Sequence, residues 1–224
     1  KVGHRFYVRL ESLDPSIKWT TYDDLANIKI LEVTENIKRT NEQYPVGGII
    51  LYAWNIVDEA QLARTIPQVR SMNGSPLVCI DEEGGRVSRI ANNPNFDVQK
   101  YESMAAIGAT GDPMIAYGCG NTIGTYLKRY GFDIDFAPVA DVNTNPENVV
   151  IGARAFSEYP SVAAPMVTSY LQGLKDAGIT GCIKHFPGHG DTKADTHFGY
   201  ASTQKTWDEM MACGMVTFKA GIHS

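Results

Sequence analysis

Residues 77–89 read LVCIDEEGGRVSR, an apolar run followed at once by three acids, two glycines and two arginines. The apolar run is short and β-branched, which is typical of a strand buried on both faces of a parallel sheet. The charged residues that follow mark the carboxyl end of that strand. The stretch therefore predicts a buried strand whose end carries groups able to do chemistry.

Four other apolar runs repeat this pattern, at residues 6–10, 48–52, 134–139 and 181–183. The longer segments between them have the signals of helix starts. Asp58 and Asp112 can cap helices, Pro113 fits a first helical position, and a further helix begins at about Pro160. Pro67 is expected to kink or shorten the first of these helices. Strands that alternate with helices indicate parallel pairing through right-handed crossovers.

Two α/β architectures fit this alternation. A doubly wound dinucleotide fold needs a G-x-G-x-x-G stretch after an early strand, and the sequence has none. Barrel enzymes carry their sites at the carboxyl ends of several strands, where the charged residues of this sequence lie. The fold class predicted is therefore α/β, a TIM-type (β/α)8 barrel. With five strands visible in 224 residues, we expect about the first five βα units, and a single domain over residues 1–224 that is incomplete at its C-terminal end.

The composition excludes several classes of partner. Hydrophobic residues make up 43% and charged residues 20%, and the formal net charge is −5. This balance lacks the basic footprint of a nucleic-acid binder, and no apolar run is long enough to span a membrane. The four cysteines are widely spaced without a C-x-x-C pair, so we expect small buried side chains rather than a zinc ribbon or a disulfide scaffold.

Residues 184–197, KHFPGHGDTKADTH, hold three of the five histidines. His185 and His189 have the i, i+4 spacing of a zinc pair, but the proline and glycine between them exclude a helix. A structural histidine cluster is a second alternative. We favour a sugar-binding or catalytic loop, in which Lys184 and His185 could donate hydrogen bonds to substrate hydroxyls.

Within this segment, Asp195-Thr196-His197 suggests a catalytic pair. Residues i and i+2 of an extended chain project to the same side, so the Asp195 carboxylate can hold the His197 imidazole in one tautomer and stabilise its cation. Glycines on both sides permit the loop to close over a ligand.

Two further segments carry polar groups. In residues 81–89 one carboxylate can face a ligand while the two arginines compensate the others, although a solvated charged turn is an alternative. Asp141 and Asn143 close the fourth predicted strand, and Arg154 lies on the loop beyond it. Taken alone, this last segment is a generic strand exit with a surface arginine.

Together these segments resemble glycoside hydrolase family 3, and within it the β-N-acetylglucosaminidase branch. Residues 81–87 are similar to the signature D-[QE]-E-G-G-R-V of that branch, residues 184–190 read K-H-F-P-G-H-G, and residues 195–197 match D-[ST]-H. The opening Lys1-Val2-Gly3 is similar to the start of the family's first barrel strand. The resemblance covers essentially the whole chain.

The resemblance implies a role for each matching residue. Asp81 would bind hydroxyls at the non-reducing end of the terminal sugar, with Arg89 beside it. Arg154 would orient the sugar, and Lys184 and His185 would hydrogen-bond ring hydroxyls.

The resemblance also implies that His197, oriented by Asp195, is the general acid/base, where retaining glycosidases generally use a second carboxylic acid. A histidine in this role repels anionic nucleophiles less than a carboxylate would, so phosphate could replace water in the second step. The family's nucleophilic aspartate belongs to a motif at the seventh strand, and these 224 residues hold no candidate. Asp141 falls at the fourth strand, with no nucleophilic role. We therefore expect the chain alone to be inactive.

The expected function is that of a bacterial β-N-acetylhexosaminidase, a retaining enzyme that removes terminal β-linked N-acetylglucosamine from cell-wall- or chitin-derived saccharides. The substrate is the partner expected, with no cofactor, metal, nucleic acid or membrane span. The alternatives are a non-catalytic carbohydrate-binding fragment and other family 3 activities, namely β-glucosidase, which the D-x-H pair disfavours, and N-acetylglucosaminide phosphorylase. Family members that begin well upstream of K-V-G are often secreted or on the cell surface, which favours that location over the cytoplasm.

Overall fold

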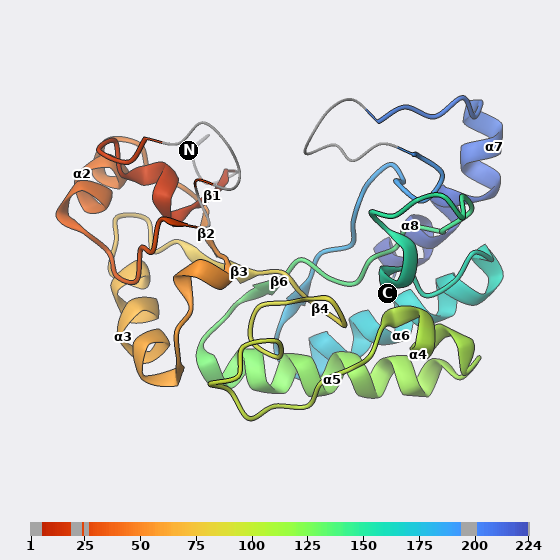
Figure 1. The fold of residues 1–224 in the computed structure, drawn as a ribbon, viewed down its shortest axis with the longest axis horizontal. Helices are drawn as coiled ribbons and strands as arrows, with labels where there is room; N and C mark the ends of the chain where they lie inside the picture. Colours follow the sequence, from red (N-terminus) through yellow and green to blue (C-terminus); the bar gives the residue numbers. More distant parts are fainter. Residues whose placement is uncertain (1–5, 19–23, 25–26, 194–200, 224) are drawn as a thin grey trace.

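The structure is a computed structural model that describes residues 6–18, 24, 27–193 and 201–223. Its core is a five-stranded parallel sheet in the order β1-β2-β3-β6-β7, which is also the order of these strands along the chain. Figure 1 shows β1, β2, β3 and β6 in this order. The strands are β1 (Tyr7–Arg9), β2 (Gly48–Leu51), β3 (Leu77–Ile80), β6 (Ile134–Asp135) and β7 (Thr180–Gly181). This is the order of the first five units of a TIM-type barrel, so the predicted fold class is confirmed.

All five predicted strands form, although β6 is shorter than the predicted run at 134–139 and β7 covers residues 180–181 rather than 181–183. Pro138 lacks an N–H group and cannot donate to a neighbouring strand. Pairing resumes one residue later, where Val139 forms a parallel bridge with Lys184 beyond the end of β7. This bridge brings the segments after β6 and β7 together at the carboxyl edge of the sheet.

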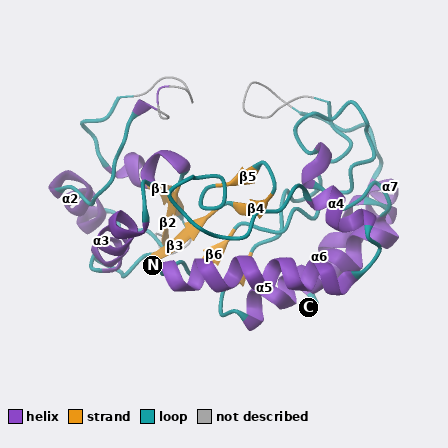
Figure 2. Ribbon diagram, turned by 60° about the horizontal axis from the view of Figure 1, so that its bottom comes forward, coloured by secondary structure: helices purple, strands orange, loops and turns teal. Residues whose placement is uncertain are grey.

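Helices connect and cover the strands (Figure 2). They are α2 (Glu35–Gln43), α3 (Glu59–Arg70), α4 (Met104–Ala109), α5 (Pro113–Tyr130), α6 (Pro160–Asp176), α7 (Trp207–Ala212) and α8 (Gly214–Ile222). Single 3-10 turns are η2 (Leu10–Leu13), η3 (Ala53–Asn55) and η4 (Gly152–Arg154), and β4 (Glu82–Gly84) forms an antiparallel hairpin with β5 (Val87–Ser88). Among the described residues, no helix has both the length and the apolar character needed to cross a membrane.

The predicted helix starts are confirmed. The Asp58 carboxylate accepts the Gln61 N–H at 2.7 Å, and that of Asp112 accepts the Met114 N–H at 2.9 Å. Of the two effects expected of Pro67, a kink or a shorter helix, the shortening is wrong, because α3 continues to Arg70. Pro67 lies in the last turn, where its carbonyl still accepts the Ser71 N–H at 3.0 Å and where fully buried Val69 anchors the helix on the core.

Helices α5 and α6 touch backbone to backbone. A Cβ atom on Gly120 would lie 2.2 Å from the Tyr170 carbonyl oxygen, and one on Gly173 would lie 2.2 Å from that of Tyr117. Only glycine permits this approach. The pairing places the buried side chains of Tyr126 and Tyr170 behind the residues that follow β3.

The expectation that all four cysteines are buried is wrong for two of them. Cys79 and Cys119 are buried, whereas Cys213 is half-buried and Cys182 is exposed. Cys182 directly follows β7, and no other strand among the described residues pairs with the outer side of β7.

Candidate active site

The residues that follow β3, β6 and β7 meet at one edge of the sheet, because the carboxyl ends of parallel strands lie together. The Lys184 carbonyl accepts the Ala140 N–H at 2.7 Å, which aligns the segment after β7 with the segment after β6. Side chains from positions 81–89, 141, 154 and 184–189 are thereby gathered into one cluster.

Lys184 is the centre of this cluster. Its Nζ lies 2.6 Å from Asp81 Oδ1 and 2.6 Å from Glu83 Oε1. The other oxygen of Asp81 lies 3.7 Å from the guanidinium of Arg89. Burial acts to lower the pKa of Lys184, but the charges of Glu83 and Asp81 outweigh it and raise that pKa. Lys184 is therefore a permanent cation held between two carboxylates.

Glu83 binds Arg154 in a bidentate pair. Arg154 Nε donates to Oε2 at 2.8 Å, and a terminal guanidinium nitrogen donates to Oε1 at 2.7 Å. Burial acts to raise the pKa of Glu83, but the hydrogen bonds from Arg154 and the charge of Lys184 prevail and lower it. The fully buried Glu83 is thus an ionised anchor for two cations.

The expectation that Arg86 and Arg89 compensate the surplus acids is wrong for Arg86. Its guanidinium donates to the backbone carbonyls of Val149 and Val150 instead. The turn at Gly84 and Gly85, both with positive φ, directs Arg86 toward that loop. The cations that reach Glu83 are Arg154 and Lys184, which come from distant segments of the sequence.

Glu82 has a different environment from its two acidic neighbours. Its carboxylate accepts the backbone N–H groups of Arg89, Ile90 and Ala91 and the hydroxyl of Tyr126. It therefore holds the turn that carries Arg89. Burial raises the pKa of Glu82.

Behind Glu82 lies a second buried acid, Asp135 at the end of β6. One oxygen of Asp135 accepts the Glu82 N–H at 2.9 Å, while the other has no hydrogen-bond partner among the described residues. Burial raises the pKa of Asp135 well above its ordinary value. This acid joins β6 to the start of β4 and is not exposed to the cluster's solvent face.

Asp141 holds His185. Asp141 Oδ2 accepts the His185 backbone N–H at 3.1 Å and lies 2.6 Å from the ring nitrogen Nδ1, while Oδ1 accepts the His189 N–H at 2.6 Å. The other ring nitrogen of His185, Nε2, lies 3.2 Å from a terminal nitrogen of Arg154. The cluster is thus continuous from Asp81 through Lys184, Glu83 and Arg154 to His185 and Asp141.

This cluster occurs in a chain whose residues 20–224 match the family described as glycosyl hydrolase family 3 N terminal domain. The chain belongs to glycosyl hydrolase family 3. The resemblance seen in the sequence is confirmed.

Two curated relatives illustrate the similarity. The chain is 35% identical over 203 residues to a beta-hexosaminidase of Stenotrophomonas maltophilia, covering 88% of this chain and 59% of that protein. It is 35% identical over 197 residues to beta-hexosaminidase A of Pseudoalteromonas piscicida, covering 84% of this chain and 32% of that protein. The family 3 chain thus spans between about a third and three fifths of the length of these relatives.

Solved structures share the fold. A glycoside hydrolase family 3 β-N-acetylglucosaminidase from Paenibacillus superimposes with a TM-score of 0.84 at 29% identity, covering 99% of this chain and 39% of that one. NagZ from Neisseria gonorrhoeae gives a TM-score of 0.78 at 25% identity, covering 96% and 58%.

The five binding residues expected from the family 3 resemblance are placed in one cluster: Asp81, Arg89, Arg154, Lys184 and His185. The expected acid/base pair, Asp195 and His197, lies outside the described residues. Sequence reasoning missed the roles of Glu83 and Asp141 as buried anchors. The alternation of Asp81 and Glu83 at i and i+2 was a signal that both face the same side.

The rings of His185 and His189 lie with their centroids 6.0 Å apart, at an interplanar angle of 74°. The main chain turns between them, with the Gly188 N–H donating to the His185 carbonyl at 2.8 Å, and His189 Nδ1 lies 2.5 Å from the Thr192 hydroxyl. No group of three or more His, Cys, Asp or Glu side chains suited to a metal ion occurs in the described part of the chain.

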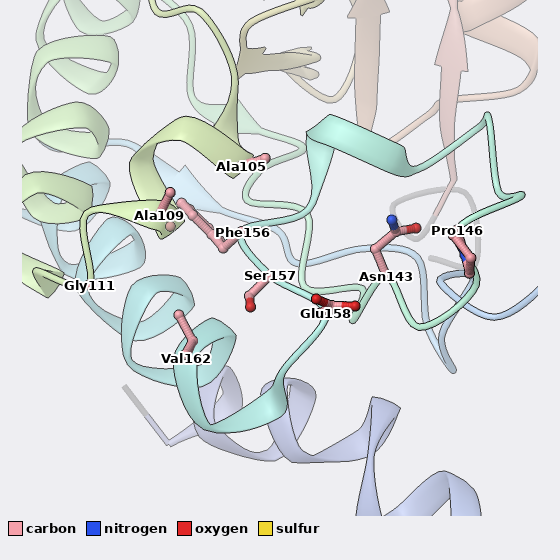
Figure 3. A pocket seen from close by; sticks show the side chains of 10 residues that line it. Ala105, Ala109, Gly111, Asn143, Pro146, Phe156, Ser157, Glu158 and Val162 are labelled. Carbon is pink, nitrogen blue, oxygen red and sulfur yellow. The ribbon is translucent and has the colours of Figure 1, made fainter.

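A separate cavity of about 500 Å³ lies between α4, the segment after β6 and the start of α6 (Figure 3). Its walls include Ala105 and Ala109 of α4, and Asn143, Ser157 and Glu158 contribute polar groups. None of the five clustered binding residues lines it.

Proposed function

We propose that this chain supplies the sugar-binding face and the acid/base loop of a retaining β-N-acetylhexosaminidase. The observation that carries the proposal is the cluster centred on Lys184, at the carboxyl edge of a family 3 sheet. The relatives named beta-hexosaminidase and β-N-acetylglucosaminidase support N-acetylglucosamine as the sugar released. Cell-wall- or chitin-derived saccharides are the substrates proposed.

The charges of the cluster suit a neutral polyol. Three carboxylates, Asp81, Glu83 and Asp141, face three permanent cations, Arg89, Arg154 and Lys184. The sum is zero, so the cluster has no net charge with which to select an ionic ligand. It offers closely spaced donors and acceptors, as the hydroxyls of a sugar require, because each hydroxyl both donates and accepts.

The chemistry proposed takes two steps. A carboxylate nucleophile, which the family carries at the seventh strand, attacks the anomeric carbon while His197 protonates the leaving oxygen. Water then displaces the enzyme carboxylate, and the His197 imidazole takes the water proton. Asp195 would hold that imidazole in place and stabilise its cation.

The test uses the full-length protein that carries this chain, with an aryl N-acetyl-β-glucosaminide and the matching aryl β-glucoside. We expect kcat/KM to favour the N-acetylated substrate and the sugar to be released with retained configuration. Lys184→Met should lower kcat/KM by about 10- to 100-fold, the effect of losing a charged hydrogen-bond donor. Lys128→Met is the matched control, because the Lys128 ammonium bonds the Gly178 carbonyl away from the cluster.

Other results would contradict the proposal in distinct ways. Preference for the glucoside would indicate a β-glucosidase, and turnover that requires phosphate would indicate a phosphorylase. Sugar binding without turnover by the full-length protein would indicate a carbohydrate-binding module.

A further inference from the structure

We propose that Asp141 fixes His185 in the neutral tautomer protonated at Nδ1, so that Nε2 faces the sugar site as a hydrogen-bond acceptor. Asp141 is thus a positioning residue that acts through His185. Its importance for catalysis rests on the proposed function, whereas the tautomer itself does not.

The first observation is the surroundings of the Asp141 carboxylate, which is fully buried. Two main-chain N–H groups, from His185 and His189, already donate to its two oxygens. The oxygen that accepts the His185 N–H also lies 2.6 Å from His185 Nδ1. An Nδ1 without a proton would bring two lone pairs together at this distance, so Nδ1 carries the hydrogen and donates it.

The second observation is the contact on the other side of the ring. A guanidinium nitrogen of Arg154 lies 3.2 Å from His185 Nε2. A guanidinium only donates hydrogen bonds, so Nε2 must offer its lone pair. Arg154 cannot readily turn away, because Glu83 holds two of its nitrogens. Both ring nitrogens therefore require the same tautomer.

This tautomer changes the expectation for ligand binding. The sequence suggested that Lys184 and His185 both donate to the sugar. In the structure Lys184 Nζ donates, whereas His185 Nε2 can only accept. Nε2 has one lone pair, which already faces Arg154, so a sugar hydroxyl that reaches it must donate its own hydrogen and share this acceptor with the guanidinium. A site built for such a bond rejects an analogue that lacks the hydroxyl.

An asparagine cannot replace Asp141 in this position. Each carboxylate oxygen accepts a main-chain N–H, so the amide NH2 group of Asn would oppose one of those donors in either orientation. In metal sites, the loss of a group that orients a ligating histidine typically lowers activity by about 10- to 100-fold. We expect a loss of this size for Asp141→Asn, largely through His185.

The direct test is the NMR spectrum of the histidine rings in protein labelled with ¹⁵N-histidine, with the His185 signal assigned by its loss in His185→Ala. At neutral and mildly alkaline pH we expect His185 to show a protonated Nδ1 and an unprotonated Nε2, and Asp141→Asn to shift the ring toward the other tautomer. A proton on Nε2 in the unmodified protein, or no change in Asp141→Asn, would overturn the inference. The spectrum of the unmodified protein tests it even where the variant fails to fold.

The second test is a double-mutant cycle in the full-length protein, measured as kcat/KM on an aryl N-acetyl-β-glucosaminide. Because Asp141 acts through His185, Asp141→Asn should cost at most about threefold when His185 is already Ala. Fully additive losses would overturn that role. The matched control is Asp133→Asn, since Asp133 also accepts a main-chain N–H, from Val78, but lies at the opposite edge of the sheet.

The two proposals fail separately. If the unmodified protein hydrolyses no N-acetylglucosaminide, the proposed function is wrong, and the spectrum alone then decides the tautomer.

Discussion

Arg154 and His185 contact each other, and each is held by its own fully buried carboxylate, Glu83 and Asp141. Removing one member of a buried ion pair such as Arg154 and Glu83 typically costs about 3–5 kcal/mol, because the remaining charge is left without a partner in a poorly solvated site. The side chains that would meet the sugar are therefore fixed before it arrives. Little side-chain entropy would be lost on binding.

At the scale of single residues, the buried Asp135 leads us to predict how the stability of the fold depends on pH. Burial raises its pKa above that of the unfolded chain, about 3.9. Above that pH the unfolded chain releases the proton while the folded protein still holds it. The free energy of unfolding therefore falls as the pH rises from the unfolded pKa toward the folded one. Asp135→Asn should therefore melt at a higher temperature than the unmodified protein at neutral pH, and the difference should shrink below about pH 4.

The control for this experiment is Asp112→Asn, because asparagine caps a helix as well as aspartate does. Its melting temperature should follow the unmodified protein across the same pH range. An Asp135→Asn protein that is less stable at neutral pH would show that the carboxylate is ionised and needed.

The role proposed for His197 gives a second residue-scale prediction. In the full-length protein, His197→Ala should lower turnover by about 10² to 10⁴, the usual contribution of a general acid/base. The loss should shrink for aryl leaving groups that are already acidic, because they depart with little protonation. A His185 variant should lose the same factor for every leaving group. An equal proportional loss in the His197 variant would mean that His197 is not the acid.

The residues of the cluster were predictable, but their connections were not. Motif spacing identified Asp81 and Lys184, yet they are 103 positions apart and meet only through the sheet. The partner of Glu83 could not be read from nearby arginines, because Arg154 is 71 positions away and Arg86 turns toward a backbone loop. Buried ion pairs depend on tertiary geometry that short-range patterns do not contain.

At the scale of elements, caps and apolar periodicity predicted the strands and the main helices, since these signals are local. The short hairpin of β4 and β5 was not predicted, because β4 consists of two glutamates and a glycine, β5 has only two residues, and their pairing depends on Glu82 and the turn it holds. The closeness of α5 and α6 was also not evident from either helix alone.

The contact between α5 and α6 predicts a contrast between two glycines of one helix. Gly120→Ala should destabilise the chain by about 3 kcal/mol, because the added methyl group would meet the Tyr170 carbonyl, which cannot move aside. Gly118→Ala is the control, since a Cβ there has nothing within 4 Å. It should stabilise α5 by about 0.5–1 kcal/mol. Urea unfolding would measure both, and equal effects would contradict the close packing.

At the scale of the molecule, the outer side of β7 and the exposed Cys182 suggest a surface that further barrel strands would cover. We propose that the domain continues in this way in the longer protein. Maleimide should then label Cys182 in the 224-residue chain, and labelling should fall at least about tenfold in the longer protein because burial blocks access to the thiol. Mass spectrometry of the peptides would measure this.

Cys79 and Cys119 provide the internal control for this labelling. Both are buried, and burial raises the pKa of each thiol to about 12, so neither should react in either protein. Equal labelling of Cys182 in the two proteins would show that β7 remains an edge.

The three acids Asp81-Glu82-Glu83 have different partners, and this limits which sequence changes homologous proteins can tolerate at these positions. The first and third acids face the cations of the cluster, while the middle one ties down the following turn. One residue inserted or deleted just before them would exchange these two environments, because neighbouring side chains of an extended segment point to opposite sides. A substitution here alters the contacts of one side chain, but an inserted or deleted residue would turn all three acidic side chains to the opposite side. We therefore expect homologous sequences to vary in the identity of these residues before they vary in the number of residues between β3 and β5.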